Sequence, residues 1–287
     1  MESITRLWKL TGVVENRVAV VCTTKWDVLD KVIACIEGEG ECVRTACLVL
    51  NNLSVPIENK AVMALGQWGD RLLAALVSIM RRDLPETYLC CTCLANLTFL
   101  PDAVGIAINF VPPVAANNMS PEEPEFRNRN DSLPRNRSLN KSMLLPLADA
   151  VPTVLQDQQS LLRVLECTLH RNAPFLLAPV TSTQGEALRR SCHLVRNLAA
   201  HSDGPKLLAL TAIPRLLISF LQNTNKPVVR WTSQSLEDSA LATLCHLACN
   251  PCAKDALSPI EGILEPIIAE GGIHAYRASA IASALHS

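Results

Sequence analysis

One pattern of apolar, small and polar positions occurs four times along the chain and predicts a repeated amphipathic helix. Each copy has a polar anchor residue directly followed by leucine, with aliphatic or cysteine residues two and five positions before the anchor. Positions separated by three residues stack on one face of a helix, so each copy forms a narrow apolar seam with the anchor at its edge. The copies are Thr45–Ser54, Leu89–Thr98, Arg190–Ala199 and Ser239–Ala248, with the anchors Asn52, Asn96, Asn197 and His246.

The segments between the copies predict two further helices in each unit, a short one followed by a longer one. In the second unit the short helix lies between Pro56 and Gly66, and the longer helix covers Asp70–Arg82. The anchors Asn52 and Asn96 are 44 residues apart. This spacing is typical of a three-helix repeat.

The later part of the chain follows the same order. The fourth unit ends with Val228–Ala248, and a fifth unit ends with Ile273–His286. Residues 1–15 are less regular, and we expect Trp8 and Leu10 in this segment to cover the apolar end of the stack.

The spacing between the second and third anchors is longer than one repeat. It is 101 residues, which is one period and about 59 further residues, or two periods and about 17. We favour one period with an insertion, because residues 111–143 hold five prolines and few apolar residues, as disordered segments do. The predicted organisation is N-terminal repeats in 1–110, a disordered insertion in 111–143 and C-terminal repeats in 144–287, all in one continuous solenoid.

The insertion holds two serines in basic surroundings. Ser132 follows Arg129, and Ser138 follows Arg135 and Arg137, which resembles the substrates of basophilic kinases. Phosphorylation of Ser132 or Ser138 would add about two negative charges to a basic segment. An unmodified, solvated linker is the alternative, because short motifs match by chance.

Composition favours packed helices and disfavours several other classes of protein. Of the 287 residues 49% are apolar and only 4% are aromatic, a balance that favours helices over a β-sandwich. The net charge of −1 argues against a general electrostatic attraction to nucleic acid. We find no run of about 18 uncharged apolar residues for a membrane span and no secretory signal. We therefore expect a cytoplasmic protein, also present in the nucleus, whose twelve cysteines are reduced.

The copies and the segments that follow them resemble armadillo repeats. The similarity is carried by LVLNNLS with NKAVM after it, and by LANLT, LVRNLA and AIPRLLISFL later in the chain. It is nearest to the armadillo repeats of the plant U-box and Vac8 type. The resemblance implies an all-α, right-handed α-solenoid of three-helix repeats, in which each unit buries its core on its neighbours. It also implies a non-enzymatic scaffold or adaptor that binds an extended or helical segment of a partner protein in a concave groove lined by the third helices.

The resemblance places three anchors at the groove. Asn52, Asn96 and Asn197 stand where the family's asparagine hydrogen-bonds the backbone of a bound peptide, for which an amide offers one acceptor and two donors. A solvated residue that only finishes its helix is the alternative for each. His246 departs from the pattern, so we expect a ligand to span the first three copies.

The surroundings of Asn197 indicate the chemistry of a ligand. Arg190, His193 and Arg196 lie in the same copy and favour an acidic ligand. The nuclear-import branch of the family has a tryptophan four residues before the asparagine. The residues at that position here are Leu48, Thr92, His193 and Ala242. Recognition of basic nuclear signals is therefore disfavoured.

Two other classes of function are alternatives. The chain could be the substrate-binding subunit of a ubiquitin-ligase system, with the catalytic module on a partner. More remotely, Cys245, Cys249 and Cys252 have the spacing of an iron–sulfur site, or with His246 could bind zinc. An enzyme with that cluster needs a βα barrel after the motif, and only 35 residues follow Cys252. No nucleotide, metalloprotease or serine-hydrolase motif occurs, so we expect no enzymatic activity, no bound metal and no cofactor.

Overall fold

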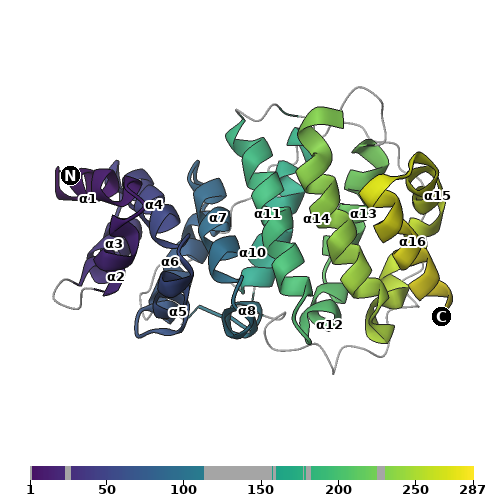
Figure 1. The fold of residues 1–287 in the computed structure, drawn as a ribbon, viewed down its shortest axis with the longest axis horizontal. Helices are drawn as coiled ribbons and strands as arrows, with labels where there is room; N and C mark the ends of the chain where they lie inside the picture. The colour runs from purple at the N-terminus through teal and green to yellow at the C-terminus, as the bar shows by residue number, and fades with distance from the viewer. Residues whose placement is uncertain are drawn as a thin grey trace.

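The computed structural model describes residues 2–22, 27–112, 157, 160–176, 178, 182–224 and 230–287 of the chain. The secondary structure of these residues is helical, without a strand. The helices follow one another along one elongated stack that begins at the N-terminus and ends at the C-terminus (Figure 1). The chain is a helical solenoid, as the repeated pattern predicts.

The described helices form five units of three, preceded by one single helix. Each unit has a first, a second and a third helix, and the third helix of the first four units contains the repeated pattern. The single helix is α1 (Glu2–Gly12). The units are α2 (Asn16–Cys22), α3 (Val28–Glu37) and α4 (Cys42–Leu53); α5 (Ile57–Leu65), α6 (Gly69–Arg81) and α7 (Thr87–Leu97); α8 (Pro101–Ile108), α10 (Leu161–Asn172) with the 3-10 turn η3 (Ala173–Phe175), and α11 (Thr183–Ala199); α12 (Gly204–Ala209), α13 (Ile213–Thr224) and α14 (Arg230–Ala248); and the 3-10 helix η4 (Pro251–Ile260), α15 (Glu261–Glu270) and α16 (Gly272–His286).

The third helices pack on one another from end to end. The pairs in contact are α1 with α4, α4 with α7, α7 with α11, α11 with α14, and α14 with α16. The first helices α5, α8 and α12 lie along the lower edge of the view in Figure 1. Because α11 packs on α7, the stack continues from the second unit into the third. Most of the insertion, with Ser132 and Ser138, lies outside the described residues.

The single helix α1 takes the place of a third helix. Leu7, Leu10 and Thr11 stand at the same positions relative to Lys9 as the seam residues and the following hydroxyl do relative to Asn52 and Asn96. The sequence pattern did not reveal this copy, because Lys9 replaces the anchor asparagine. Trp8 and Leu10, expected to cover the end of the stack, are themselves 41% and 46% exposed.

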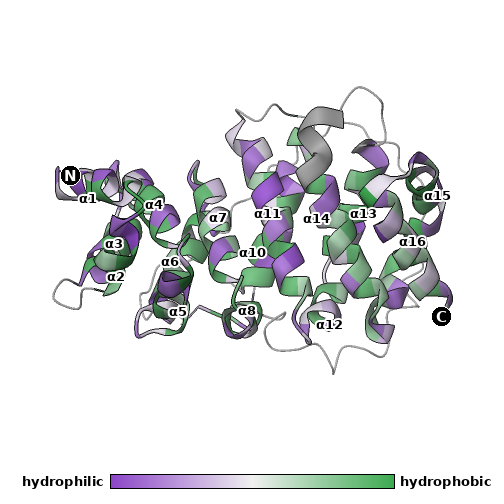
Figure 2. Cartoon of the chain, viewed as in Figure 1, coloured by the Kyte–Doolittle hydropathy of each residue, from purple (hydrophilic) through white to green (hydrophobic). Residues whose placement is uncertain are grey.

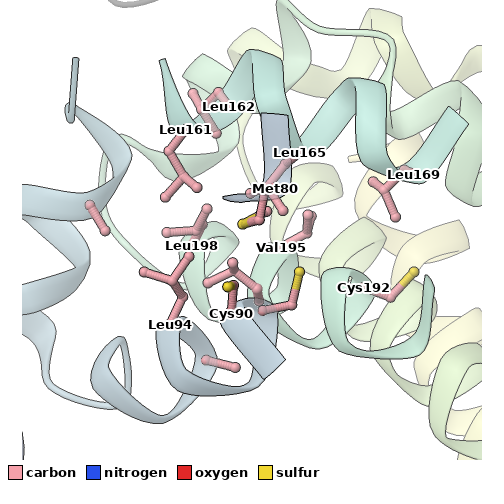
Figure 3. Packing of buried hydrophobic residues seen from close by; sticks show 14 of the residues in the cluster. Met80, Cys90, Leu94, Leu161, Leu162, Leu165, Leu169, Cys192, Val195 and Leu198 are labelled. Carbon is pink, nitrogen blue, oxygen red and sulfur yellow. The ribbon is translucent and has the colours of Figure 1, made fainter. Parts of the chain in front are cut away.

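The seams of the third helices form the continuous core. Around the contact between α7 and α11, Leu94 meets Val195 and Leu198, with Leu165 of α10 beside them (Figure 3). The four residues are fully buried. Each contributes roughly 1.5–3 kcal/mol relative to an exposed side chain. Figure 2 shows hydrophobic and hydrophilic residues on each third helix, as expected when one face is buried and another is free.

Five cysteines belong to this core. Their thiols pack as small apolar groups, either at a seam position or directly beside one, and Figure 3 shows Cys90 near Leu94 and Cys192 on α11. The five are Cys47, Cys90, Cys91, Cys93 and Cys192, each at most 1% exposed. Burial raises the pKa of Cys91 and of Cys93 to about 12, so these thiols are unreactive at neutral pH.

Candidate functional site

The three anchor asparagines each donate a hydrogen bond to the preceding third helix. The pairs are Asn52 Nδ2 to Thr11 Oγ1 at 3.3 Å, Asn96 Nδ2 to Ser54 Oγ at 3.0 Å, and Asn197 Nδ2 to Thr98 Oγ1 at 3.2 Å. In every pair the acceptor stands two residues after the anchor position of the preceding copy. We call this series of bonds the asparagine ladder. It joins α1, α4, α7 and α11 in order.

The ladder uses the amide nitrogens of the three asparagines. Asn197 Nδ2 also donates to the Ala95 carbonyl oxygen at 2.8 Å. The side chains of Asn52, Asn96 and Asn197 are partly buried, and their hydrogen bonds to other described residues involve Nδ2 alone. The structure thus gives these residues a stabilising role, and their contact with a ligand stays a prediction in which Oδ1 is the acceptor.

The ladder stops between α11 and α14, where both of its partners have changed. His246 stands at the donor position of α14, and Ala199 stands at the acceptor position of α11 in place of serine or threonine. Ala199 is 1% exposed and has no polar side-chain atom. The departure of the fourth copy, visible in the sequence only as His246, is therefore a change of both residues of a pair.

An ionic arrangement joins the helices at this point instead. Arg196 Nη1 of α11 lies 3.1 Å from Asp238 Oδ2 of α14, and the Arg277 guanidinium of α16 pairs with Asp238 Oδ1. The Arg277 guanidinium also donates to the Asp238 carbonyl oxygen at 3.3 Å. The side chains of Arg196, Asp238 and Arg277 are 39%, 27% and 21% exposed, so one carboxylate holds two arginines from neighbouring units at the surface.

Two histidines lie within the field of Arg196. Partial burial lowers the pKa of His193, and the charges of Arg196 and Arg190 lower it further. Partial burial also lowers the pKa of His246, again with a contribution from Arg196. We call Arg190, His193, Arg196, His246 and Arg277 the basic face. It crosses three adjacent third helices, α11, α14 and α16, which pack side by side (Figure 1).

Glu186 balances the N-terminal end of the basic face. It accepts from Arg190 Nε at 2.7 Å and from Arg189 Nε at 3.0 Å. Although burial raises the pKa of Glu186, the hydrogen bonds from the two arginines outweigh burial, and its pKa is lowered overall. Arg189 and Arg190 thus pair with Glu186, and Arg196 and Arg277 pair with Asp238.

The sequence predicts part of this arrangement. Arg190, His193 and Arg196 lie in one copy, and the structure brings them together on α11. Asp238 and Arg277 could not be predicted, because they lie in other units and only the stacking of the helices places them beside Arg196. The end of the ladder could have been predicted from the sequence, because His246 replaces the donor asparagine and Ala199 replaces the acceptor hydroxyl.

The cysteines near the C-terminus do not assemble a metal site. Cys245 is partly buried, whereas Cys249 and Cys252 are exposed, and all three are free thiols. No group of three or more histidine, cysteine, aspartate or glutamate side chains in the described part of the chain could hold a metal ion. The interpretation of Cys245, Cys249 and Cys252 as an iron–sulfur or zinc site therefore has no geometric support.

Comparison with known proteins gives one kind of similarity. No protein-family profile matches the sequence, and no curated protein matches it. Among solved structures, a chain from a study of a phosphorylation switch in the interaction between cadherin and beta-catenin matches with a TM-score of 0.46 and 14% identity. The match covers 94% of this chain and 56% of the other, so the present chain spans about half of that neighbour's length. Across the residues that the structure describes, each helix is too short or too polar to cross a membrane.

Proposed function

We propose that this protein is a non-enzymatic scaffold that binds an acidic segment of a partner protein across the basic face. The observation that carries the proposal is the convergence of Arg196 and Arg277 on Asp238 from two different units. Arginine forms bidentate, charge-assisted hydrogen bonds to carboxylates. A pair of arginines that is already oriented by a shared carboxylate loses little side-chain entropy when it binds a second one.

The position of the basic face favours a segment that lies across several helices. Arg190, His193 and Arg196 lie on α11, His246 lies on α14 and Arg277 lies on α16, so the basic groups are spread over three helices. An acidic chain that contacts all of them would run along the stack, towards Asn197 and the ladder of α7 and α4. This proposal moves the ligand towards the C-terminal units, whereas the sequence alone favoured the first three copies.

The proposal is tested by the affinity of a fluorescent glutamate-rich peptide for the whole chain, measured by anisotropy at low and physiological salt. The double variant Arg196→Gln/Arg277→Gln removes two cationic groups. We expect it to lose about tenfold or more in affinity at low salt, since each charge-assisted bond is worth roughly 1.5–3 kcal/mol.

A matched control separates the basic face from general charge. Lys206 of α12 and Arg215 of α13 are exposed cations of the fourth unit that lie on first and second helices. The variant Lys206→Gln/Arg215→Gln carries the same change in net charge, and we expect its affinity to stay within about twofold of the wild type. Equal losses in both variants would show a non-specific attraction and refute the proposal.

The cellular setting belongs to the same proposal. All twelve cysteines are free thiols, which fits a reducing compartment, and we propose that the protein acts in the cytoplasm and also in the nucleus. No observation on the described residues favours a ubiquitin-ligase subunit or a specific kinship with the U-box and Vac8 repeats.

A further inference from the structure

Two thiols lie together at the ends of one tight turn in the first unit. Cys35 is in the last turn of α3, and Cys42 is the first residue of α4. Cys42 Sγ lies 3.6 Å from the Cys35 carbonyl oxygen and 3.9 Å from the Glu39 carbonyl oxygen. Both side chains are partly exposed. The fold therefore places two accessible thiols beside each other on separate helices.

The interaction between the two thiols also lowers the reactivity of Cys35. Burial raises the pKa of the Cys35 thiol, and the charge of the Cys42 sulfur and a hydrogen bond with it raise that pKa further. Cys35 therefore ionises less readily than an ordinary cysteine. Since a thiolate is the species that reacts with peroxides, Cys35 is poorly suited to be the first thiol to react.

The turn that joins α3 to α4 brings Cys35 and Cys42 close together. Gly40 has a φ of 99°, in the region that glycine adopts without strain, and Val43 N donates to the Gly40 carbonyl oxygen at 3.2 Å. The chain therefore reverses direction between the two cysteines and brings the end of α3 to the start of α4.

Two other thiol pairs lack either the exposure of Cys35 and Cys42 or their placement on separate helices. Cys47 and Cys90 hydrogen-bond to each other but are 1% and 0% exposed. Cys245 and Cys249 are hydrogen-bonded and more exposed, yet they lie one turn apart on the same helix. Side chains at that spacing have Cβ atoms about 5–6 Å apart, whereas a disulfide needs about 3.5–4.5 Å.

We propose that Cys35 and Cys42 form a reversible disulfide when the protein meets a hydroperoxide. The Cys42 thiolate attacks the O–O bond, so that the sulfur becomes a sulfenic acid and the hydroperoxide is reduced to an alcohol, or to water from hydrogen peroxide. The Cys35 thiol then attacks the Cys42 sulfur, the S–S bond forms, and the oxygen leaves as water. The two thiols together lose two electrons and two protons, and a small-molecule thiol reverses the reaction.

The disulfide would fix one wall of a surface pocket. The turn Gly38–Glu41 lines a cavity of about 510 Å³, together with Arg44 of α4 and with Arg82, Leu84 and Glu86 of the next unit. Arg44 spans the two units, with Nη1 3.8 Å from Glu86 Oε1. A bridge between Cys35 and Cys42 ties the two ends of this turn and reduces its motion. This inference does not depend on the proposed acidic ligand, whose site lies in the third to fifth units.

The test is mass spectrometry of the full chain after graded exposure to hydrogen peroxide, followed by alkylation under denaturing conditions and digestion with trypsin. Residues 32–44 form one tryptic peptide that holds Cys35 and Cys42, and residues 45–60 form another that holds Cys47. We expect the first peptide to lose two hydrogens and to take up no alkylating label, while Cys47 stays fully labelled. Treatment with dithiothreitol should restore both labels.

Two comparisons keep the test decisive. In Cys42→Ser we expect Cys35 to stay alkylatable at every dose that oxidises the wild type, with unchanged helical circular dichroism. The proposal is overturned if Cys35 and Cys42 both remain alkylatable at doses that oxidise the exposed Cys22. It is equally overturned if Cys42 advances to the sulfinic acid without forming the bridge, or if Cys245 and Cys249 pair at lower doses.

Discussion

The side-chain amide of Asn96 donates to the Ser54 hydroxyl at 3.0 Å, across the contact between α7 and α4. Ser54 is fully buried and Asn96 is partly buried. Equivalent bonds to Thr11 and Thr98 make this a repeated relationship. The most regular polar residue of the repeat therefore stabilises the contact between successive units, beside any role that it has in binding.

Removal of one rung of the ladder should weaken the stack. We expect Asn96→Ala to lower the free energy of unfolding by about 1 kcal/mol, the typical net value of a hydrogen bond. Urea unfolding followed by circular dichroism measures it. In a double-mutant cycle with Ser54→Ala, we expect a coupling energy of about 0.5–1.5 kcal/mol.

Asn109 provides a control for that cycle. Its amide donates only within its own helix turn, to the Gly105 carbonyl oxygen at 3.0 Å, and its side chain is exposed. We expect Asn109→Ala to change stability by less than about 0.5 kcal/mol. A coupling near zero between Asn96 and Ser54 would contradict the structural role of the ladder.

The hydrogen bond that is missing between α11 and α14 can be introduced by mutation. The double variant Ala199→Ser/His246→Asn places a hydroxyl and an amide at the positions that pair elsewhere in the ladder. We expect each single change to be neutral or slightly destabilising and the pair to show a favourable coupling of about 0.5–1 kcal/mol in urea unfolding. If the double variant only adds the effects of the single ones, α11 and α14 are spaced differently from the earlier pairs.

Asp238 should limit the affinity of the basic face for acids. Asp238→Asn keeps the shape of the side chain and removes a negative charge from between Arg196 and Arg277. Because these ion pairs are partly exposed, we expect a stability loss of at most about 1 kcal/mol. We expect several-fold tighter binding of the glutamate-rich peptide in the anisotropy assay. Weaker binding would mean that orientation of the arginines by Asp238 matters more than its charge.

Binding should strengthen as the pH falls. His193 and His246 have pKa values below the ordinary one, so both are neutral at pH 7. A bound carboxylate favours their charged forms, so binding takes up protons. Affinity should therefore rise as the pH drops below about 6.5, until glutamates start to protonate near about 4.3. Anisotropy between about pH 7.5 and about pH 5 measures this, and a rise that persists in His193→Asn/His246→Asn would assign it to other groups.

The same pKa shifts lower the stability of the fold as the pH falls, although they raise the affinity for an acidic ligand. Because both pKa values are lowered in the folded chain, the unfolded chain takes up protons first as the pH falls. The two histidines should therefore reduce the free energy of unfolding as the pH drops through about 6.5. The variant His193→Asn/His246→Asn should lose less stability than the wild type between pH 7 and about pH 5.5.

The sequence predicted the solenoid because each unit repeats its seam. Leu50, Leu94 and Leu244 recur at one position, and spacing alone was enough to place helices on them. The copy in α1 was missed because Lys9 replaces the anchor, although its seam is intact. The seam residues of the copies in α4, α7, α11 and α14 are buried in the core, whereas the anchor position at the edge of the seam holds lysine, asparagine or histidine.

The candidate site was harder to predict from the sequence than the fold. Arg196 and Arg277 are far apart along the chain, and only the packing of α11, α14 and α16 brings them to one carboxylate. The anchor asparagines were predicted to face a ligand, and the structure adds that their amide nitrogens are engaged between units. A periodic sequence pattern reveals only the residues that recur in every unit. Ion pairs between units depend on residues that differ from one unit to the next.

Reversal of charge on the basic face tests the account most directly. The variant Arg196→Glu/Arg277→Glu, with Asp238→Lys added to preserve the ion pairs, is compared with the wild type for binding of a glutamate-rich and a lysine-rich peptide by anisotropy. We predict that the wild type binds the glutamate-rich peptide and that the variant, folded by circular dichroism, prefers the lysine-rich one. An unchanged preference in the folded variant would contradict the assignment of this face as the binding site.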